Sequence, residues 1–315
     1  MPETRLLTAD APGLTRAAAL LRAGGLVAFP TETVYGLGGD ATQDHAVAGI
    51  FAAKGRPRFN PLIVHVPDVR LVSRYAVLTP LAEQLAAAFW PGPLTLVLPL
   101  RLDGGLSPLV TAGLETVAVR VPAHPVARAL LEAFGGPLAA PSANPSGRIS
   151  PVTAQHVLEG LSGRIDGVVD GGACAVGLES TILDATGDAP VLLRAGGLAV
   201  EAVEALGLRV GVATSGAITA PGQLASHYAP RGRVRLGVVS PEAGEVWVGF
   251  GPCPGAALSL SESGDTTQAA ARLFHALHEA DALAGPGGRI GFAPVPEVGL
   301  GRAVNDRLRR AAAPR

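Results

Sequence analysis

Short apolar runs alternate with amphipathic segments along the first 200 residues, and this alternation constrains the fold more than any other feature of the sequence. Apolar runs of this length, bounded by Gly and Pro, are typical of buried strands, and the amphipathic segments are typical of helices. We expect strands at 26–29, 62–66, 94–100, 117–121, 138–140, 168–170, 180–183 and 191–194. We expect helices at 12–23, 44–53, 80–89, 124–134 and 153–161. Several strands follow one another without a helix between them, so the sequence predicts an α/β fold with a twisted mixed sheet and flanking helices.

The pattern lapses at residues 211–232, where the chain is rich in Gly, Pro and small residues. A stretch of this length without regular structure is usually functional or marks a domain boundary. Beyond it, strands are expected at 234–239, 246–250, 257–260 and 289–292, and helices at 266–284 and 303–312. We therefore expect one domain over 1–210, a linker over 211–232, and a smaller Rossmann-like α/β domain over 233–315.

Composition excludes several classes of protein. With 48% hydrophobic and 16% charged residues, the chain does not have the composition of a disordered protein. No apolar run approaches the roughly 20 residues that span a bilayer, and the first residues lead into no signal-type apolar segment, so we expect a cytoplasmic location. Cys174 and Cys253 lie far apart and show no metal-ligand spacing, so no protein-bound metal is expected. The net charge of −1 means that any nucleic-acid contact must come from a local patch.

The only lysine of the chain, Lys54, stands out among 25 basic residues. It lies in KGRPRFN, where Arg56, Arg58 and Asn60 follow within a few positions, and we expect an exposed loop there. One interpretation is a solvated basic loop. The other is a phosphate-binding loop, because Gly55 and Pro57 restrict the backbone and an apolar strand anchors its far end.

Two further segments place hydroxyl and amide groups after expected strands. PTETVYGLGGDA (residues 30–41) is expected to be a loop at a strand end, in which the GxGxxA pattern of residues 36–41 indicates a tight glycine turn. PSANPSGRISP (residues 141–151) carries Ser142, Asn144 and Ser150 between prolines. Either segment could bind ligand oxygens or simply satisfy its own backbone through local turns.

Arg120 and His65 each interrupt an apolar strand, in VAVRV and IVHV. A buried cation needs a partner, so Arg120 implies either a structural ion pair or a ligand carboxylate. His65 poses the same choice between a satisfied core residue and a ligand contact.

Taken together, these segments resemble one family. FPTETVYGLG, KGRP with NPLIVHV, FWPGPLTLVL, VAVRVPAHP, APSANPSG, STILD and LLRAGG occur in the order typical of L-threonylcarbamoyladenylate synthases, the YrdC-like enzymes. The similarity covers essentially the first 200 residues. PGQLASHYAP and the sequence after it resemble the two-domain form, which carries a C-terminal domain and a linker that closes over the active site. One departure lies at residues 223–226, where this linker has Gln-Leu-Ala-Ser in place of the expected Met and basic residues.

The resemblance implies that L-threonine, bicarbonate and ATP give threonylcarbamoyl-AMP and pyrophosphate. This is the first step in forming threonylcarbamoyladenosine beside the tRNA anticodon. Such chemistry needs positioning and charge neutralisation rather than a covalent nucleophile. The family signature KxR…SxN is matched by four residues, to which the resemblance assigns catalysis: Lys54, Arg56, Ser142 and Asn144. Mg²⁺ is expected to ride on the ATP phosphates and water.

The resemblance also divides the ligand contacts between the two larger substrates. For threonine it indicates Thr33, His65, Arg120, the backbone at Ala140, and Ser180. For ATP it indicates Lys54, Arg56, Asn60, Thr116, Ser142, Asn144, Ser150, Arg194 and the linker residue Tyr228. In this interpretation the threonine carboxylate is the partner that buried Arg120 requires.

Expected partners are a tRNA-modifying transferase complex that receives the product, a weak tRNA contact, and no membrane. Two alternatives remain at this point. One is a carbamoyl-transfer enzyme of the hydrogenase-maturation type, which would sit in a longer chain with acylphosphatase and zinc-finger segments. The other is an RNA-binding module that uses the KGRPR segment without catalysis.

Overall fold

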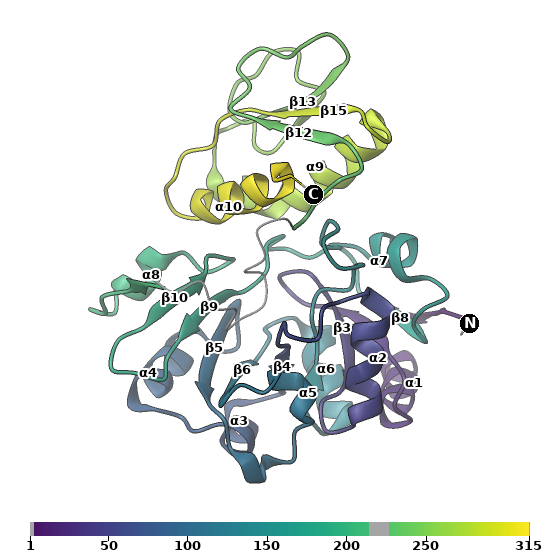
Figure 1. Cartoon of the computed structure of the whole chain (residues 1–315), viewed down its shortest axis with the longest axis vertical. Coiled ribbons are helices and arrows are strands. Elements are labelled where there is room, and N and C mark those ends of the chain that lie inside the picture. Colours follow the sequence, from purple (N-terminus) through teal and green to yellow (C-terminus); the bar gives the residue numbers. More distant parts are fainter. Residues whose placement is uncertain (1–2, 214–226, 315) are drawn as a thin grey trace.

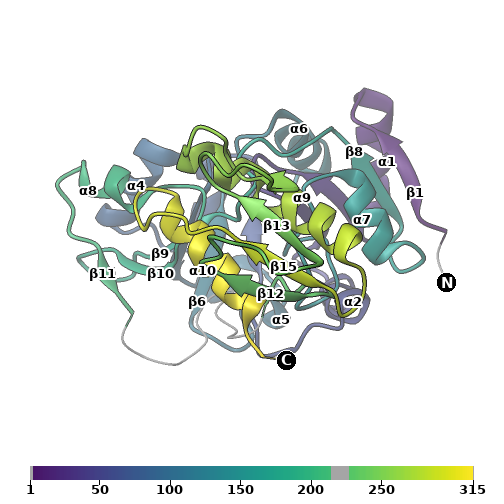
Figure 2. The ribbon, with the colours of Figure 1, turned by 90° about the horizontal axis from the view of Figure 1, so that it is seen from above.

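The computed structural model describes residues 3–213 and 227–314. Within them the chain forms a large domain built on one mixed sheet and a smaller domain built on a parallel sheet (Figure 1). The small domain lies above the large one, with its two helices turned toward it (Figures 1 and 2). The predicted fold class is confirmed. None of the helices in these residues is long and apolar enough to cross a bilayer.

The large sheet contains eleven strands in the described part of the chain. In spatial order they are β1 (Arg5–Thr8), β8 (Gly167–Asp170), β2 (Val27–Pro30), β3 (Tyr35–Asp40), β7 (Leu138–Ala139), β4 (Ile63–His65), β6 (Thr116–Arg120), β5 (Leu94–Pro99), β9 (Thr181–Asp184), β10 (Val191–Arg194) and β11 (Gly211–Val212). β4 and β6 run parallel, whereas β7 is antiparallel to both of its neighbours, β3 and β4. β11 pairs with β10, so this sheet extends into the segment expected to be a linker.

Six of the nine helices described in the large domain begin at a residue whose side chain caps the helix. The nine are α1 (Ala11–Arg22), α2 (Asp44–Lys54), α3 (Val69–Tyr75), α4 (Pro80–Phe89), α5 (Pro108–Thr111), α6 (Pro125–Phe134), α7 (Ala154–Leu161), α8 (Val200–Glu204) and the 3₁₀ helix η1 (Leu102–Gly104). Thr79, for example, caps α4 by accepting a hydrogen bond from the backbone N–H of Ala82. α1 and α6 pack together over β1, β8 and β2 through one apolar cluster that includes Leu21, Phe29 and Leu131.

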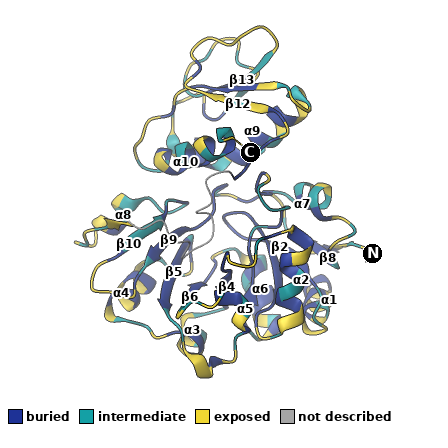
Figure 3. Ribbon diagram, viewed as in Figure 1, coloured by how far each residue is buried: buried dark blue, intermediate teal, exposed yellow. Residues whose placement is uncertain are grey.

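The small domain holds β12 (Arg233–Leu236), β15 (Arg289–Phe292), β13 (Glu245–Gly249) and β14 (Leu258–Ser259), all parallel. Its helices are α9 (Thr266–Ala284) and α10 (Gly301–Ala312). One buried apolar cluster continues from the large domain through Tyr228 to Phe274 and Leu277 of α9. Burial is concentrated in the central strands and where α9 and α10 face the large domain (Figure 3). The two domains therefore share a core.

One expected element is wrong. Residues 36–40, predicted as a tight glycine turn, are the buried strand β3, which pairs with β2 and β7. Gly38 faces the ring of Phe29 so closely that an added Cβ would lie 2.9 Å from a ring carbon. Glycine here serves close packing within the sheet, so the glycine-rich pattern did not mark a turn.

Candidate active site

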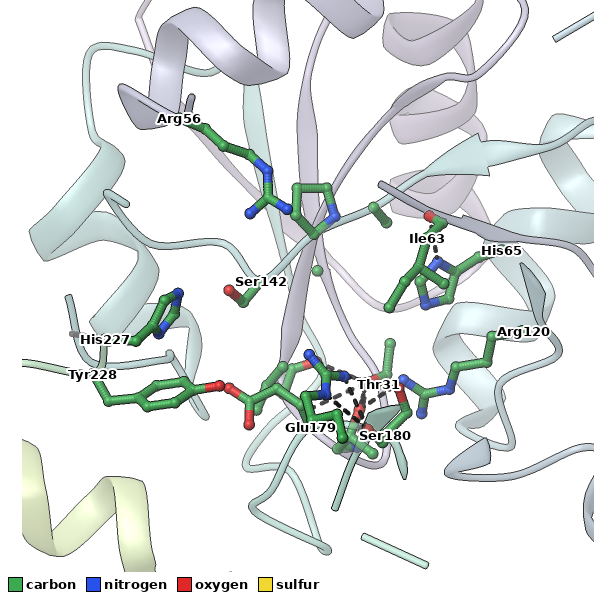
Figure 4. A pocket seen from close by; sticks show the side chains of 16 residues that line it. Thr31, Arg56, Ile63, His65, Arg120, Ser142, Glu179, Ser180, His227 and Tyr228 are labelled. Atoms are coloured by element: carbon green, nitrogen blue, oxygen red, sulfur yellow. Dashed lines mark hydrogen bonds between the residues drawn. The ribbon is translucent and has the colours of Figure 1, made fainter. Parts of the chain in front are cut away.

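The ends of several strands meet at one pocket (Figure 4), and its lining residue Glu179 is hydrogen-bonded by Arg307 of α10. β4 and β6 end in register at His65 and Arg120, and the chain after β7 continues into Ala140–Ser142. The lining residues are Thr31, Thr33, Val34, Gly36, Arg56, Ile63, His65, Arg120, Ala140, Pro141, Ser142, Glu179, Ser180, Arg194, His227 and Tyr228. The space in it that water can reach is about 50 Å³, and the pocket is partly open to solvent.

Arg120 is buried and paired inside the protein. Its Nη2 donates to Glu32 Oε1 at 2.6 Å, its Nη1 to Thr33 Oγ1 at 2.8 Å, and its Nε to the carbonyl of Gly92 at 3.2 Å. Burial alone would raise the pKa of Glu32, but the charge and hydrogen bond of Arg120 hold it below its ordinary value. Of the two partners that the sequence left open for Arg120, an ion pair within the protein or a ligand carboxylate, the structure shows the ion pair. The expectation that a threonine carboxylate is needed to satisfy this cation was wrong.

His65 lies beside Arg120 and also lines the pocket (Figure 4). Burial, together with the nearby charge of Arg120, lowers the pKa of His65 to about 3. The ring is therefore neutral near pH 7 and can offer a hydrogen bond without adding charge.

Lys54 ends α2 and is 3% exposed, so the expectation of an exposed loop lysine was wrong. Its Nζ donates to the carbonyl of Ser142 at 2.5 Å and to the carbonyl of Asn144. The backbone N–H of Ser146 in turn donates to the Lys54 carbonyl at 2.7 Å. Burial and the charge of Arg56 lower the pKa of Lys54 well below its ordinary value. Lys54 thus fastens the 142–146 loop to α2 from behind the pocket wall.

Arg56 is also buried, and it reaches the pocket itself. Its Nε donates to the carbonyl of Asn60 at 3.2 Å and its Nη2 to the carbonyl of Pro61 at 2.8 Å. Burial, followed by the charge of Arg194, lowers the pKa of Arg56 to about 10, which still leaves a cation at neutral pH. The solvated basic loop therefore describes only Arg58, which is exposed.

A third arginine, Arg194, also lines the pocket. Arg194, at the end of β10, donates from Nε and Nη2 to the carbonyl of Ser180 at 3.1 and 2.9 Å. Ser180 Oγ shares a hydrogen bond of 2.7 Å with Thr95 Oγ1. Next to it, Glu179 accepts a hydrogen bond of 2.6 Å from Ser150 Oγ. Three arginines and several hydroxyls thus surround the pocket, an arrangement suited to anionic oxygens.

Two residues from beyond the large domain complete the wall. His227 and Tyr228 line the pocket, and the N–H of Ala229 donates to the carbonyl of Gly147 at 2.9 Å. Burial lowers the pKa of His227 to about 3 and raises that of Tyr228 to about 12, so both side chains are neutral near pH 7. We call residues 227–229 the cover segment. The unusual residues Gln223 to Ser226 lie outside the described part of the chain.

The structure brings most of the predicted ligand residues together. Those that line the pocket are Thr33, Arg56, His65, Arg120, Ala140, Ser142, Ser180, Arg194 and Tyr228. Lys54, Asn60, Asn144 and Ser150 lie directly behind lining residues or the loops that carry them. Thr116 begins β6, four residues before Arg120, or about 13 Å at 3.3 Å per residue. The structure does not bring Thr116 into the lining, and its assignment to ATP stays a prediction.

Four residues at or beside the pocket were not predicted from the sequence: Glu32, Glu179, His227 and Arg307. Glu32 and Glu179 each lie within or beside a motif that was recognised, PTETVYG and STILD, and a carboxylate among apolar residues was the available signal. His227 precedes Tyr228 in SHYAP. Arg307, which contacts Glu179, sits in the basic run DRLRR, where the sequence does not distinguish buried from exposed arginines.

Comparison with known proteins places this arrangement in context. A family model described as telomere recombination (Sua5, YciO and YrdC) matches residues 19–196, and a model of the C-terminal domain of threonylcarbamoyl-AMP synthase matches residues 198–313. The threonylcarbamoyl-AMP synthase of Bacillus subtilis is 49% identical over 75% of this chain and 70% of its own length. That of Pyrococcus abyssi is 44% identical over 94% of this chain and 93% of its own. A crystal structure of P. abyssi Sua5 complexed with L-threonine superposes with a TM-score of 0.89, at 38% identity and 98% coverage of both chains.

Proposed function

This chain belongs to the family of threonylcarbamoyl-AMP synthases, and we propose that its pocket joins L-threonine, bicarbonate and ATP into threonylcarbamoyl-AMP. The observation that carries the proposal is the convergence of Arg56, Arg120 and Arg194 with Ser142 and Ser180 on one pocket. Cations and hydroxyls in this arrangement fit a reaction between anionic groups, which needs neutralisation and alignment rather than a covalent nucleophile.

The reaction has two balanced parts. The threonine amine attacks the carbon of bicarbonate, a C–N bond forms, and water leaves, which gives an N-carboxylated amino acid. An oxygen of this new carboxylate then attacks the α-phosphorus of ATP. The P–O bond to the β-phosphate breaks, so pyrophosphate leaves with that electron pair and threonylcarbamoyl-AMP remains.

Threonine is assigned to the side of the pocket formed by Thr33, His65, Arg120, the backbone at Ala140, and Ser180. Because Arg120 is paired with Glu32, its charge is already balanced and its rigid fork can orient a carboxylate without supplying an unpaired cation. Neutral His65 adds a polar contact beside it. The resemblance of the whole chain to a protein crystallised with L-threonine supports this assignment.

ATP is assigned to the side formed by Arg56, Ser142, Arg194 and Tyr228, with Asn60, Asn144, Ser150 and Thr116 as the further predicted contacts. Lys54 acts here by holding the Ser142 loop in place, while Arg56 and Arg194 provide charge at the pocket surface. The cover segment forms part of the pocket wall and the water-accessible space there is only about 50 Å³, so we propose that this segment moves when the nucleotide enters and excludes water once it returns.

Mg²⁺ enters as part of the nucleotide substrate. In the described residues no group of three or more His, Cys, Asp or Glu side chains could hold a metal ion, and the lining carboxylate Glu179 is engaged by Arg307 and Ser150. Mg²⁺ does not need such a group of protein ligands, because it keeps several waters and binds through phosphates. When bound it would neutralise phosphate charge. Arg56 and Arg194, which line the pocket, would add to that neutralisation.

We further propose that the product passes to a tRNA-modifying transferase complex in the cytoplasm, with at most a weak contact between this chain and tRNA. A mixed anhydride of a carbamate and a phosphate is labile in water, which favours rapid consumption by the next enzyme.

Pyrophosphate release from ATP, measured with and without threonine and bicarbonate, tests the proposal. Release that requires both co-substrates is expected. The RNA-binding alternative predicts instead a salt-dependent RNA affinity that survives saturating ATP and threonine, together with no pyrophosphate release. That pair of results would overturn the proposed function.

A further inference from the structure

Arg307 is the fully buried arginine of α10, with 0% exposure, in a helix whose neighbouring arginines Arg302 and Arg309 face solvent. Burying a guanidinium is unfavourable unless it is paired and hydrogen-bonded. Asp306 of the same helix provides one partner, but the other two groups that Arg307 hydrogen-bonds belong to the large domain.

Those two groups lie at the pocket. Arg307 Nε donates to Glu179 Oε2 at 3.0 Å, and Nη1 donates to the carbonyl of Ala195 at 2.6 Å. Glu179 lines the pocket, and Ala195 directly follows Arg194, which also lines it. Burial alone would raise the pKa of Glu179, but the charges of Arg307 and Arg194 keep it below its ordinary value. Arg307 therefore keeps an ionised carboxylate neutralised in the wall of a pocket that receives anions.

Arg307 also contacts the cover segment. Its guanidinium carbon lies 5.5 Å from the centre of the Tyr228 ring, and the ring of Phe274 on α9 lies 5.4 Å from the same ring. The N–H of His227 donates to the carbonyl of Arg310, one helical turn beyond Arg307. The small domain thus holds the cover segment through α9 and α10 together.

Tyr228 needs such support because of its backbone. Its φ of +60° lies in the left-handed region, which side-chain-bearing residues adopt only when their surroundings impose it. Its ring extends toward Glu179 at the edge of the pocket (Figure 4). A single guanidinium therefore contacts the two lining residues, Glu179 and Tyr228, that meet there.

We infer that Arg307 is a positioning residue for the proposed reaction, through which the small domain fixes Tyr228 and Glu179 in the wall that closes on ATP. The inference rests on the proposed function. It gives the small domain a specific task, which is to complete the nucleotide side of a pocket that the large domain only partly forms.

The experiment compares full-length chains carrying Arg307→Met, Arg307→Lys and, as a matched control on the same helix, Arg309→Met. Arg309 is exposed and pairs with Glu297 at 2.6 Å, away from the pocket. Two properties are measured: amide hydrogen exchange of residues 227–229 without substrate, and kcat and KM for ATP and for threonine. Lysine keeps the charge but lacks the planar fork that bonds Glu179 and Ala195 while facing Tyr228.

Both Arg307 variants are expected to exchange the 227–229 amides about tenfold faster and to raise the KM for ATP about tenfold, with the KM for threonine changed less than about twofold. Arg309→Met is expected to match the parent chain in each property. If Arg307→Met does not fold, Arg307→Lys alone decides. A folded Arg307→Lys with unchanged exchange or an unchanged KM for ATP overturns the inference, even if its melting temperature falls. If the parent chain shows no threonine-dependent activity, the proposed function has failed, and hydrogen exchange still judges whether Arg307 holds the cover segment.

Discussion

Lys54 donates a hydrogen bond of 2.5 Å from its ammonium group to the carbonyl oxygen of Ser142, 88 residues further along the chain. This contact ties the end of α2 to the loop that carries Ser142 and Asn144. It links the two halves of the KxR…SxN signature and explains why a lysine is needed there. An ammonium group donates in several directions to closely spaced carbonyls, whereas a planar guanidinium does not.

Replacing Lys54 by alanine is expected to lower stability as well as activity. The two carbonyls of Ser142 and Asn144 would lose their donor inside the protein, which costs about 1–3 kcal/mol for each group left unsatisfied. If Lys54 were an exposed loop residue, its replacement would leave the melting temperature unchanged. Because Lys54 is buried and hydrogen-bonded, we expect the melting temperature to fall. Thermal unfolding and pyrophosphate release measure the two effects. Arg58→Ala, an exposed cation four residues away, serves as the control and should change neither. A melting temperature of Lys54→Ala equal to that of the parent chain would refute the fastening role.

Glu32→Gln is expected to destabilise the large domain. The substitution leaves the charge of Arg120 buried without its partner, and breaking a buried pair typically costs about 3–5 kcal/mol. Denaturant unfolding measures this loss. Glu132→Gln removes the partner of an exposed pair with Arg128 and should cost less than about 1 kcal/mol. Equal losses in the two variants would show that the Arg120–Glu32 pair is not the internal partner described above.

Tyr228→Ala is expected to weaken ATP binding about tenfold, because the aromatic wall that closes on the nucleotide is lost. Tyr228→Phe keeps the ring beside Arg307 and Phe274 and should retain most of the affinity. Equilibrium binding of ATP to the full chain checks both values. An unchanged affinity of Tyr228→Ala would remove Tyr228 from the nucleotide side of the pocket.

Stability is expected to fall in mildly acidic solution through a histidine pair at the domain interface. His156 of α7 stacks on His278 of α9 with ring centres 3.8 Å apart, and His275 lies beside them. Burial lowers the pKa of both His156 and His278 to about 4, and the neighbouring histidines lower the pKa of His156 further. Glu159 acts on His156 and Asp281 acts on His278 in the opposite direction, and each effect is smaller than that of burial. The unfolded chain therefore binds protons more readily between pH 6.5 and about 4. The contribution is fully present above pH 6.5 and is lost as the pH falls toward 4.

Urea unfolding at a series of pH values measures this dependence. His278→Gln can keep a hydrogen-bond donor near the Ser150 carbonyl but cannot titrate, so its stability should decline less steeply between pH 6.5 and 4. Other buried histidines, His65 and His227 among them, titrate in both proteins, so the difference between the two curves is the informative quantity. Superimposable slopes would contradict the assignment to this pair.

Much of the architecture could be predicted from the sequence because helix caps and apolar runs are local signals. The helix predicted at 266–284 is observed as α9 over the same residues, and the strand predicted at 191–194 is β10. β3 was not predicted as a strand because its residues 36–39 have the composition of a turn. The need for glycine there comes from packing within the sheet, which the sequence does not show. The short helices α5 and α8 and the edge strand β1 were too brief to give a periodic signal.

The residues of the site likewise include some that the sequence predicts and some that it does not. Residues within recognisable motifs, such as Arg56, Ser142 and Arg194, could be anticipated, and they do line one pocket. What the sequence could not provide was pairing over long distances. Glu32 pairs with Arg120, which lies 88 residues away in the sequence, and Arg307 pairs with Glu179, which lies 128 residues away. Such partners are chosen by the folded arrangement, and no local pattern marks them.

The most direct test of the account is mass spectrometry of the nucleotide formed from ATP, Mg²⁺, L-threonine and ¹³C-labelled bicarbonate. The account predicts threonylcarbamoyl-AMP that carries the isotope, with an equal amount of pyrophosphate, and no such product when threonine is omitted. Unlabelled AMP or ADP as the only nucleotide product, formed equally without threonine, would contradict it.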